Sequence, residues 1–337
     1  MKKSFLILVV LALLASACTN PLAIDFDQKP EILVMNAMMS TEEYNHYVQL
    51  SISRLDETFA LIDAQVDCYV NGELVAHAEG MPEYYPESEI GSYIFQADFH
   101  PGDEIRLEAR KDALHASATV TVPQPAAIIA VDTVSIAQSP YYPREEDPVA
   151  LSCKLHLQDI PGQSNWFRLV ALFEETFYID GWTNKKQKRI NFGFDQDPIL
   201  ADGHPSQQSR NSFSELFDAF STPNTFLSFR DTAFADGIGE PEIHIPYTAF
   251  TAFDDLIFYG MNVQKAEKSV RFVLFSISRE EYDYLEQVAK SRIRALGVLS
   301  EPTHIPSNVE GGLGFVSVSS ASTHVITLPP KLIPTNL

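Results

Sequence analysis

The stretch QVDCYVNGEL at residues 65–74 decides how the N-terminal half of this chain is expected to fold. Its apolar residues occupy every second position from Val66 to Val70, which is the period of a β-strand with one buried face. Asn71-Gly72 follows, and this pair favours a type I′ turn because both central residues of that turn need positive φ. The stretch therefore predicts a β-hairpin.

The same period of two recurs on both sides of this hairpin. Pro101-Gly102-Asp103 marks another turn. About seven short strands without a helical period predict a small antiparallel β-sandwich, immunoglobulin-like or transthyretin-like, for residues 31–124. Apolar and polar residues alternate most clearly in four further segments, at 48–52, 93–99, 105–109 and 116–122.

The C-terminal half, residues 149–337, is expected to form a larger β-rich domain. A cluster of prolines separates it from the first domain, so residues 125–148 are interpreted as a Pro-rich boundary and loop. Its predicted strands are longer and more aromatic, at 149–157, 166–179, 189–194, 225–229, 254–263 and 270–278.

Two helices are expected to interrupt these strands, because two capping-box sequences are present. Ser212 and Glu215 open a short helix that runs through Phe220. Ser278 and Glu281 open a longer amphipathic helix. Its apolar residues follow 3-4-4-3 spacing before Gly297 ends it: Tyr282, Leu285, Ala289, Ile293 and Leu296.

Composition excludes several classes of protein. The 337 residues suggest two domains, and 45% hydrophobic residues are too many for a disordered chain. The 24 Lys and Arg against 45 Asp and Glu give a net charge of −21, which repels phosphate backbones, so nucleic acid is not an expected partner. Three cysteines are too few for a disulfide scaffold. Cys68 and Cys153 both fall on the apolar phase of predicted strands and are expected to be small buried hydrophobes.

Residues 1–17 have the features of a secretory signal peptide. Two lysines precede an apolar run that is too short to span a membrane, and small residues follow it. Leu14-Ala15-Ser16-Ala17-Cys18 resembles the lipobox of bacterial lipoproteins, in which the cysteine sulfur receives a diacylglyceryl group and the new N-terminus is acylated. The alternative is a simple secreted protein in which Cys18 is incidental.

A lipidated Cys18 attaches the protein to a membrane without crossing it. Each buried CH₂ contributes about 0.8 kcal/mol, so several acyl chains make a strong anchor where one chain is marginal. Residues 18–30 are then a lipidated tether. Thr19 is not the aspartate that signals inner-membrane retention in some bacteria, which favours the outer membrane. The cell-surface and the periplasmic face both stay open.

Few residues suggest chemistry. The chain has no nucleophile elbow, P-loop, dinucleotide fingerprint or zinc-protease helix. The basic run at 185–189 is interpreted as a solvated hairpin tip. The aromatic stretch between Trp166 and Trp182 has the composition of a sugar-stacking surface, although core packing is the default for such strands. No catalytic residue is predicted.

Two acidic loops are weak candidates for calcium, and no other metal or cofactor is expected. Oxygen-rich loops are what a hard cation requires, but neither loop has EF-hand spacing. A chain this acidic also places carboxylates in loops by chance. The first loop holds Asp195, Asp197 and Asp202, and the second holds Asp231, Asp236 and Glu240.

Several segments together resemble one known family. Asn165-Trp166 opens a predicted strand, residues 214–218 lie in the middle of the chain, and residues 281–285 lie on the long helix. The most specific segment is 306–315, which contains Asn308, Glu310, Gly311, Gly312 and Gly314. These segments resemble the domain-of-unknown-function 4249 family of Bacteroidota lipoproteins. The resemblance implies an outer-membrane lipoprotein, often encoded beside a TonB-dependent receptor, and it brings no catalytic residues.

The three glycines of segment 306–315 have two interpretations. The structural one is that they permit positive φ or a close backbone approach where the chain leaves a helix and enters a strand. The functional one is that this loop docks a partner.

Three functions are compatible with these observations. The favoured one is a non-enzymatic accessory lipoprotein that presents a ligand or binding surface beside a TonB-dependent transporter. The alternative is a surface glycan- or peptide-binding lipoprotein that works alone. A hydrolase with carboxylates contributed by distant loops is the third, because glycoside cleavage needs only two carboxyl groups and leaves no local motif.

Overall fold

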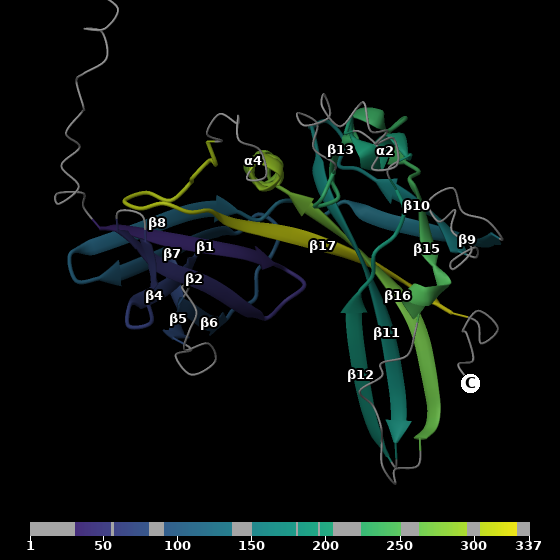
Figure 1. Ribbon diagram of the computed structural model, residues 1–337, viewed down its shortest axis with the longest axis horizontal. Helices are drawn as coiled ribbons and strands as arrows, with labels where there is room; N and C mark the ends of the chain where they lie inside the picture. Colours follow the sequence, from purple (N-terminus) through teal and green to yellow (C-terminus); the bar gives the residue numbers. More distant parts are fainter. Residues whose placement is uncertain are drawn as a thin grey trace, which may run out of the picture.

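The computed structural model describes residues 31–54, 57–80, 91–136, 150–179, 181–194, 196–204, 224–250, 263–294 and 304–328. Within these residues the protein is mainly β, and its strands form one sheet of 13 strands and one of four (Figure 1). The expected mainly β fold is confirmed. An amphipathic helix and a short helix accompany the strands of the C-terminal half.

The N-terminal module consists of eight strands that enclose one apolar core. They are arranged in the order β1-β2-β6-β5-β4-β7-β8, with β3 paired to β2. The predicted hairpin is confirmed, because Asn71 and Gly72 both have positive φ, at 51° and 84°. The strands are β1 (Ile32–Ser40), β2 (Asn45–Arg54), β3 (Glu57–Ala60), β4 (Gln65–Val70), β5 (Glu73–Gly80), β6 (Gly91–Gln96), β7 (Glu104–Lys111) and β8 (Leu114–Thr121).

The C-terminal module has a second core, in which aromatic side chains such as Phe167, Phe173 and Phe272 are fully buried. The small sheet has the order β14-β10-β15, with β9 also paired to β10. The module contains β9 (Ala127–Ile136), β10 (Ala150–Gln158), β11 (Trp166–Ile179), β12 (Trp182–Arg189), β13 (Ser228–Arg230), β14 (Ile238–Gly239), β15 (Glu242–Pro246), β16 (Val263–Ile277), α2 (Pro198–Ala201), α4 (Arg279–Arg294) and the 3₁₀ turns η3 (Asp231–Ala233) and η4 (Tyr247–Phe250).

One strand, β17 (Val316–Thr327), joins the two modules into a single sheet. Its first part pairs in parallel with β1, and its remainder pairs antiparallel with β16 (Figure 1). Val309, Val316 and Val318 pack into the core of the N-terminal module. The predicted domain limits stay a prediction, but residues 127–136 of the expected loop at 125–148 form β9. The topology adds that residues 309–319 return to the first module before β17 continues along β16.

The two described cysteines are buried, as predicted. Cys68 and Cys153 are both free thiols with almost no exposed surface. Burial raises the pKa of each thiol to about 12, so neither is a thiolate at neutral pH.

Helix α4 confirms the described part of the predicted stripe, because Tyr282, Leu285 and Ala289 are buried. The Ile293 side chain, Leu296 and Gly297 lie outside the described residues. Its capping box forms only in part. The Glu281 N–H donates to the Ser278 hydroxyl at 3.1 Å, but the Glu281 carboxylate is buried and lies 3.7 Å from Arg168 instead of returning to the helix start. The other predicted helix, at residues 212–220, lies outside the described residues. The short helix that the structure does describe is α2 (Pro198–Ala201).

Two predictions about β12 are wrong. The basic run at 185–189 is not a hairpin tip but the last five of the eight residues of β12, which pairs along its length with β11. The turn precedes it at Gly181, whose φ is 86°. Lys185 lies 2.8 Å from Glu174 on the neighbouring strand, so cross-strand pairing with carboxylates lets a basic sequence form a strand. The strand predicted at 189–194 is therefore also wrong, because β12 ends at Arg189.

Candidate functional site

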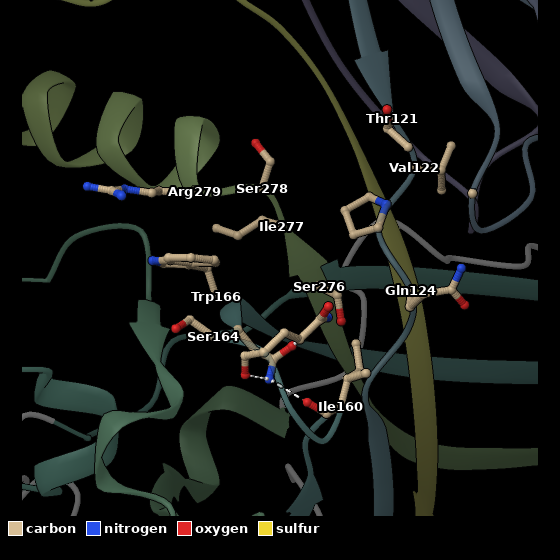
Figure 2. Close-up of a pocket in the computed structure, with 14 residues that line it drawn as sticks. Thr121, Val122, Gln124, Ile160, Ser164, Trp166, Ser276, Ile277, Ser278 and Arg279 are labelled. Carbon is tan, nitrogen blue, oxygen red and sulfur yellow. Dashed lines mark hydrogen bonds between the residues drawn. The ribbon is translucent and has the colours of Figure 1, made fainter.

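A pocket of about 390 Å³ lies where the two modules meet (Figure 2). The end of β8 and the connection to β9 form one wall, and the start of β11 with the end of β16 and the start of α4 form the other. The lining residues that the structure describes are Gly102, Thr121, Val122, Pro123, Gln124, Ile160, Gln163, Ser164, Asn165, Trp166, Ser276, Ile277, Ser278 and Arg279.

Asn165 shapes the wall contributed by the second module. Its side-chain amide donates to the carbonyls of Ile160 and Gln163 and to the Asp231 carboxylate, at 3.0 to 3.1 Å. Its backbone N–H donates to the same Asp231 carboxylate at 2.8 Å. Asn165 is almost fully buried, so these bonds fix the turn before β11 to the turn η3. The residue is thus a scaffold for the pocket wall.

Trp166 supplies the large aromatic surface of the pocket. It opens β11, where it pairs with Ile277 of β16, and it packs at the edge of a small cluster with Tyr282 and Leu285 of α4. In Figure 2, Trp166 and Gln124 lie on opposite sides of the view. The indole is half-buried, so its remaining surface is available to a ligand.

The connection between the modules is fixed beside the pocket. The Ala126 N–H donates to the Ser276 hydroxyl at 2.9 Å, and the Ile128 N–H donates to the Ser322 hydroxyl at 3.2 Å. These bonds hold the chain that leaves β8 against β16 and β17. The pocket is therefore built on ordered backbone from both modules.

The described lining of the pocket carries polar side chains and one large aromatic group. The described lining residues include no Asp, Glu, His or Cys, so they offer no general acid, general base or nucleophilic thiol. They offer hydroxyl and amide groups, one indole and the largely exposed guanidinium of Arg279, which lies 3.5 Å from Asp283. This set suits a neutral or weakly anionic polar ligand with one flat apolar surface.

The motif segment, as we call residues 308–315 within the segment 306–315, lies in a different place from the pocket. The Glu310 N–H and carbonyl bond the backbone of Ser117 on β8, and the Leu313 N–H and carbonyl bond Leu33 and Met35 on β1. The segment therefore connects the first and last strands of the N-terminal module. Asn308 continues this pairing with its side chain, which donates to the Val316 carbonyl at 2.7 Å and accepts from the Val316 N–H at 2.9 Å.

The glycines of the motif segment have no room for a side chain. A Cβ at Gly311, Gly312 or Gly314 would stand 2.1 to 2.5 Å from a backbone carbonyl oxygen of a neighbouring strand. Gly311 and Gly314 also have positive φ, at 74° and 114°. The structural interpretation of these glycines is confirmed, because they permit both a left-handed backbone and a close approach of strands.

Helix α4 connects the pocket with the motif segment. Ser278 and Arg279 at its start line the pocket, and the Tyr284 ring stacks on Phe315 with centroids 4.1 Å apart. Glu281 lies between them, buried beside Arg168 and Ser317, and burial raises the pKa of its carboxyl while Arg168 opposes that rise. The helix start, the motif segment and β11 thus form one packed unit.

The calcium candidates are bound to protein donors. Asp197 is the N-cap of α2, and its carboxylate accepts from the N–H groups of Ile199, Leu200 and Glu242 at 2.9 to 3.0 Å. Asp202 accepts from Arg230 and from the Tyr282 hydroxyl. Asp195 lies outside the described residues. Among the residues that are described, no three His, Cys, Asp or Glu side chains gather as a metal site.

The second acidic loop has similar partners. Asp231 holds Asn165, and Glu240 lies 2.6 Å from Lys154 and 3.1 Å from His156. Glu240 is nevertheless largely exposed, and Asp236 occupies a left-handed turn at φ 51°. The loop is thus organised by protein contacts.

The sequence predicted no pocket. Asn165 and Trp166 were part of the family resemblance, with no role assigned to the pair, and the structure places both in the pocket wall. Gln124, Gln163, Ser276 and Arg279 were not singled out, because isolated polar residues at strand ends and in a Pro-rich connection carry no local signal. Cys18 lies outside the described residues, so its lipidation stays a prediction. Among the described helices, none has the length and apolar character needed to span a membrane.

Fold and site together define a mainly β protein whose two modules share one sheet and enclose a pocket at their junction. The chain belongs to the family described as Domain of unknown function (DUF4249), whose model matches residues 19–324. No curated protein matches the chain.

Two solved structures show distant similarity. One is a DUF4785 family protein from Legionella pneumophila, with 8% identity and a TM-score of 0.22, and the match covers 72% of this chain and 52% of that chain. The present chain thus spans about half of that protein. The other is a chimeric titin Z1Z2 tandem carrying a peptide from fibronectin, with 14% identity, a TM-score of 0.18, and coverage of 74% and 92%.

Proposed function

We propose that this protein is a non-enzymatic, lipid-anchored binding protein of the outer membrane that works as an accessory component beside a TonB-dependent transporter. The observation that carries the binding role is the pocket at the module junction, whose described lining offers an indole with hydroxyl and amide groups. Ligand pockets commonly lie between modules, where two surfaces converge.

The sequence supports the place of action. The lipobox-like stretch ending at Cys18 provides the anchor, and residues 18–30 provide a tether that reaches at most about 45 Å when extended. The tether enters the fold at β1, the strand that pairs with β17 and so with the second module. The resemblance to family members encoded beside TonB-dependent receptors supports the partner.

A crosslinking experiment tests this proposal. Cells expressing the full-length protein are crosslinked, the membranes are extracted with mild detergent, and co-purified proteins are identified by mass spectrometry. We expect a TonB-dependent receptor with the wild-type protein and much less of it with Cys18→Ser. A monodisperse protein that retains no receptor would contradict the accessory role. Labelling with an alkyne fatty acid tests the anchor separately, because Cys18→Ser removes its acceptor.

The second candidate is a glycan- or peptide-binding lipoprotein that works alone. The half-buried Trp166 in a pocket that the amides of Gln124 and Gln163 also line favours it, because aromatic rings and amides together recognise sugars and peptides. Calorimetry with glycan and peptide panels tests it. Trp166→Ala should abolish binding, whereas Trp182→Ala, which changes an indole that is 81% exposed and outside the pocket, should not. No heat of binding across both panels would remove this candidate.

A hydrolase is the least supported candidate. Glycoside cleavage needs two carboxyl groups flanking the bond. The described lining of the pocket contains no carboxyl group, so no hydrolase chemistry is proposed there.

A further inference from the structure

The outer surface of the N-terminal module has two faces of opposite character. On β4 and β7, outward positions carry an ionic network, which we name the ionic face. Asp67 accepts from His77 at 2.6 Å and from Gln65 at 2.7 Å, and Glu108 pairs with both Arg106 and Arg110. The Arg106 guanidinium also lies 4.1 Å from the centre of the Tyr69 ring.

On β1, β2 and β6 the outward positions carry no charged side chain. We name this surface the amide face and define it by Met38, Asn45, Tyr47, Gln49, Ile94 and Gln96. Strand register places these side chains in rows, since Asn45 is opposite Gln96 and Tyr47 is opposite Ile94. In a chain with a net charge of −21, the outward positions between the two ends of these strands are thus uncharged, and the exposed Arg54 at the end of β2 pairs with Glu31 at 3.0 Å.

The amide face is exposed and partly preorganised. Tyr47 is 51% exposed and Met38 is 46% exposed, and the side chains of Asn45, Gln49 and Gln96 are exposed as well. The Gln96 amide donates to the Asn45 carbonyl oxygen at 3.0 Å, which orients both amides. Uncovered aromatic and apolar groups in a contiguous patch indicate an interaction surface.

The chemistry of this surface selects among partners. A protein interface is also depleted of charge in its core, but a buried primary amide there needs a matched donor and acceptor or costs free energy. Sugar hydroxyls supply both a donor and an acceptor, and sugar rings present flat C–H surfaces to tyrosine. An anionic polymer finds no countercharge here and is repelled by the net charge of the chain.

We propose that the amide face binds a neutral polysaccharide chain, with Tyr47 as the stacking platform and the flanking amides of Asn45, Gln49 and Gln96 as hydrogen-bonding partners. This site is separate from the junction pocket, so its test is independent of the test of the transporter role. The rows of side chains on adjacent strands form an extended surface, which suits an extended polymer.

Affinity electrophoresis tests the proposal. The full chain in mild detergent is run in native gels containing a neutral glucan, mannan, xylan or galactan, and in a gel containing heparin. We expect at least one neutral polymer to retard the protein and heparin not to do so. Tyr47→Ala and Gln49→Glu should each weaken the retardation at least tenfold.

Matched variants distinguish binding at the amide face from a general effect of added charge and from binding in the pocket. Thr119→Glu adds the same charge as Gln49→Glu, but on β8 beside the ionic face, and should leave retardation unchanged. Retardation that Trp166→Ala abolishes and Gln49→Glu leaves unchanged would place the polymer in the pocket and overturn the proposal. Thermal melting shows that each variant is folded, and Gln49→Glu decides the test if Tyr47→Ala is not. No retardation by any neutral polymer, or equal loss in Thr119→Glu, overturns the proposal. A concentration-dependent dimer in sedimentation that Gln49→Glu abolishes also overturns it, because the face would then join two copies.

Discussion

Two of the segments on which the family resemblance rests are built in opposite ways. The motif segment at 308–315 packs backbone against backbone, and a single methyl group at Gly314 would stand 2.1 Å from the Met35 carbonyl oxygen. The Asn165-Trp166 pair faces a pocket of about 390 Å³. The first segment closes a module, and the second opens onto solvent. The first segment is closely packed and the second borders free volume, so the two should respond in opposite ways to an added side chain.

The largest loss of stability is expected in the motif segment. Gly314→Ala places a Cβ against Met35 and forces a non-glycine residue to φ 114°, so we expect a loss of about 3 kcal/mol of unfolding free energy or failure to fold. Gly72→Ala is the control, since its φ is 84° but no atom lies within 4 Å of the added Cβ. It should cost only about 1 kcal/mol. Urea unfolding measures both, and equal losses would show that the close approach at Gly314 does not matter.

Asn308 should give the next effect. Asn308→Ala leaves the N–H and carbonyl of Val316 without the side-chain bonds that continue the strand, which should cost about 2 kcal/mol. Asn308→Asp keeps the acceptor for the Val316 N–H but turns a carboxylate oxygen toward the Val316 carbonyl in place of the donor, so its loss should be larger. Urea unfolding of the two variants checks this order. If alanine and aspartate cost the same, the paired geometry is not what the asparagine contributes.

Glu281, on α4 between the motif segment and the pocket, should make the stability of the fold depend on pH. Burial raises the pKa of its carboxyl, with Arg168 and Ser317 opposing the rise. Folding therefore favours the protonated form, and its contribution to stability should fall as pH rises from the ordinary glutamate value through the raised folded value. Glu281→Gln lacks this titration. The stability difference between the two proteins should change across that window in urea unfolding at several pH values, and a constant difference would contradict it.

The sequence predicted the mainly β fold, the Asn71-Gly72 hairpin and the stripe of α4, because each depends on local period or turn chemistry. It predicted the glycine geometry of the motif segment from the residue type alone. It did not predict that this segment lies beside β1 and β8, because those contacts join residues almost 200 or more positions apart and have no local signal. The basic run was misplaced since the carboxylate that pairs with it, Glu174, is on the neighbouring strand.

The pocket itself was beyond prediction for the same reason. Asn165 was singled out only through family resemblance, and its role depends on Asp231, which lies in a distant loop. Gln124 belongs to a Pro-rich connection that predicts a boundary and not a binding wall. A pocket at a junction needs the relative position of two modules, and here β17 sets that position.

The smallest change in stability is expected for substitutions in the pocket. It tests most directly whether the pocket has the room that the motif segment lacks. The chain has two tryptophans, and Trp182 is 81% exposed, so Trp182→Phe should change stability by less than about 0.5 kcal/mol and leave Trp166 as the sole indole. Thr121→Phe in this background adds volume to the pocket opposite the second module. Because the pocket has room, the melting temperature should stay nearly unchanged while acrylamide quenching of Trp166 fluorescence decreases. An added side chain would then be tolerated in the pocket beside Asn165-Trp166, whereas an added methyl group at Gly314 would destabilise the fold. Unfolding by Thr121→Phe, or unchanged quenching in a folded variant, would show that the pocket is not open to ligands beside Trp166.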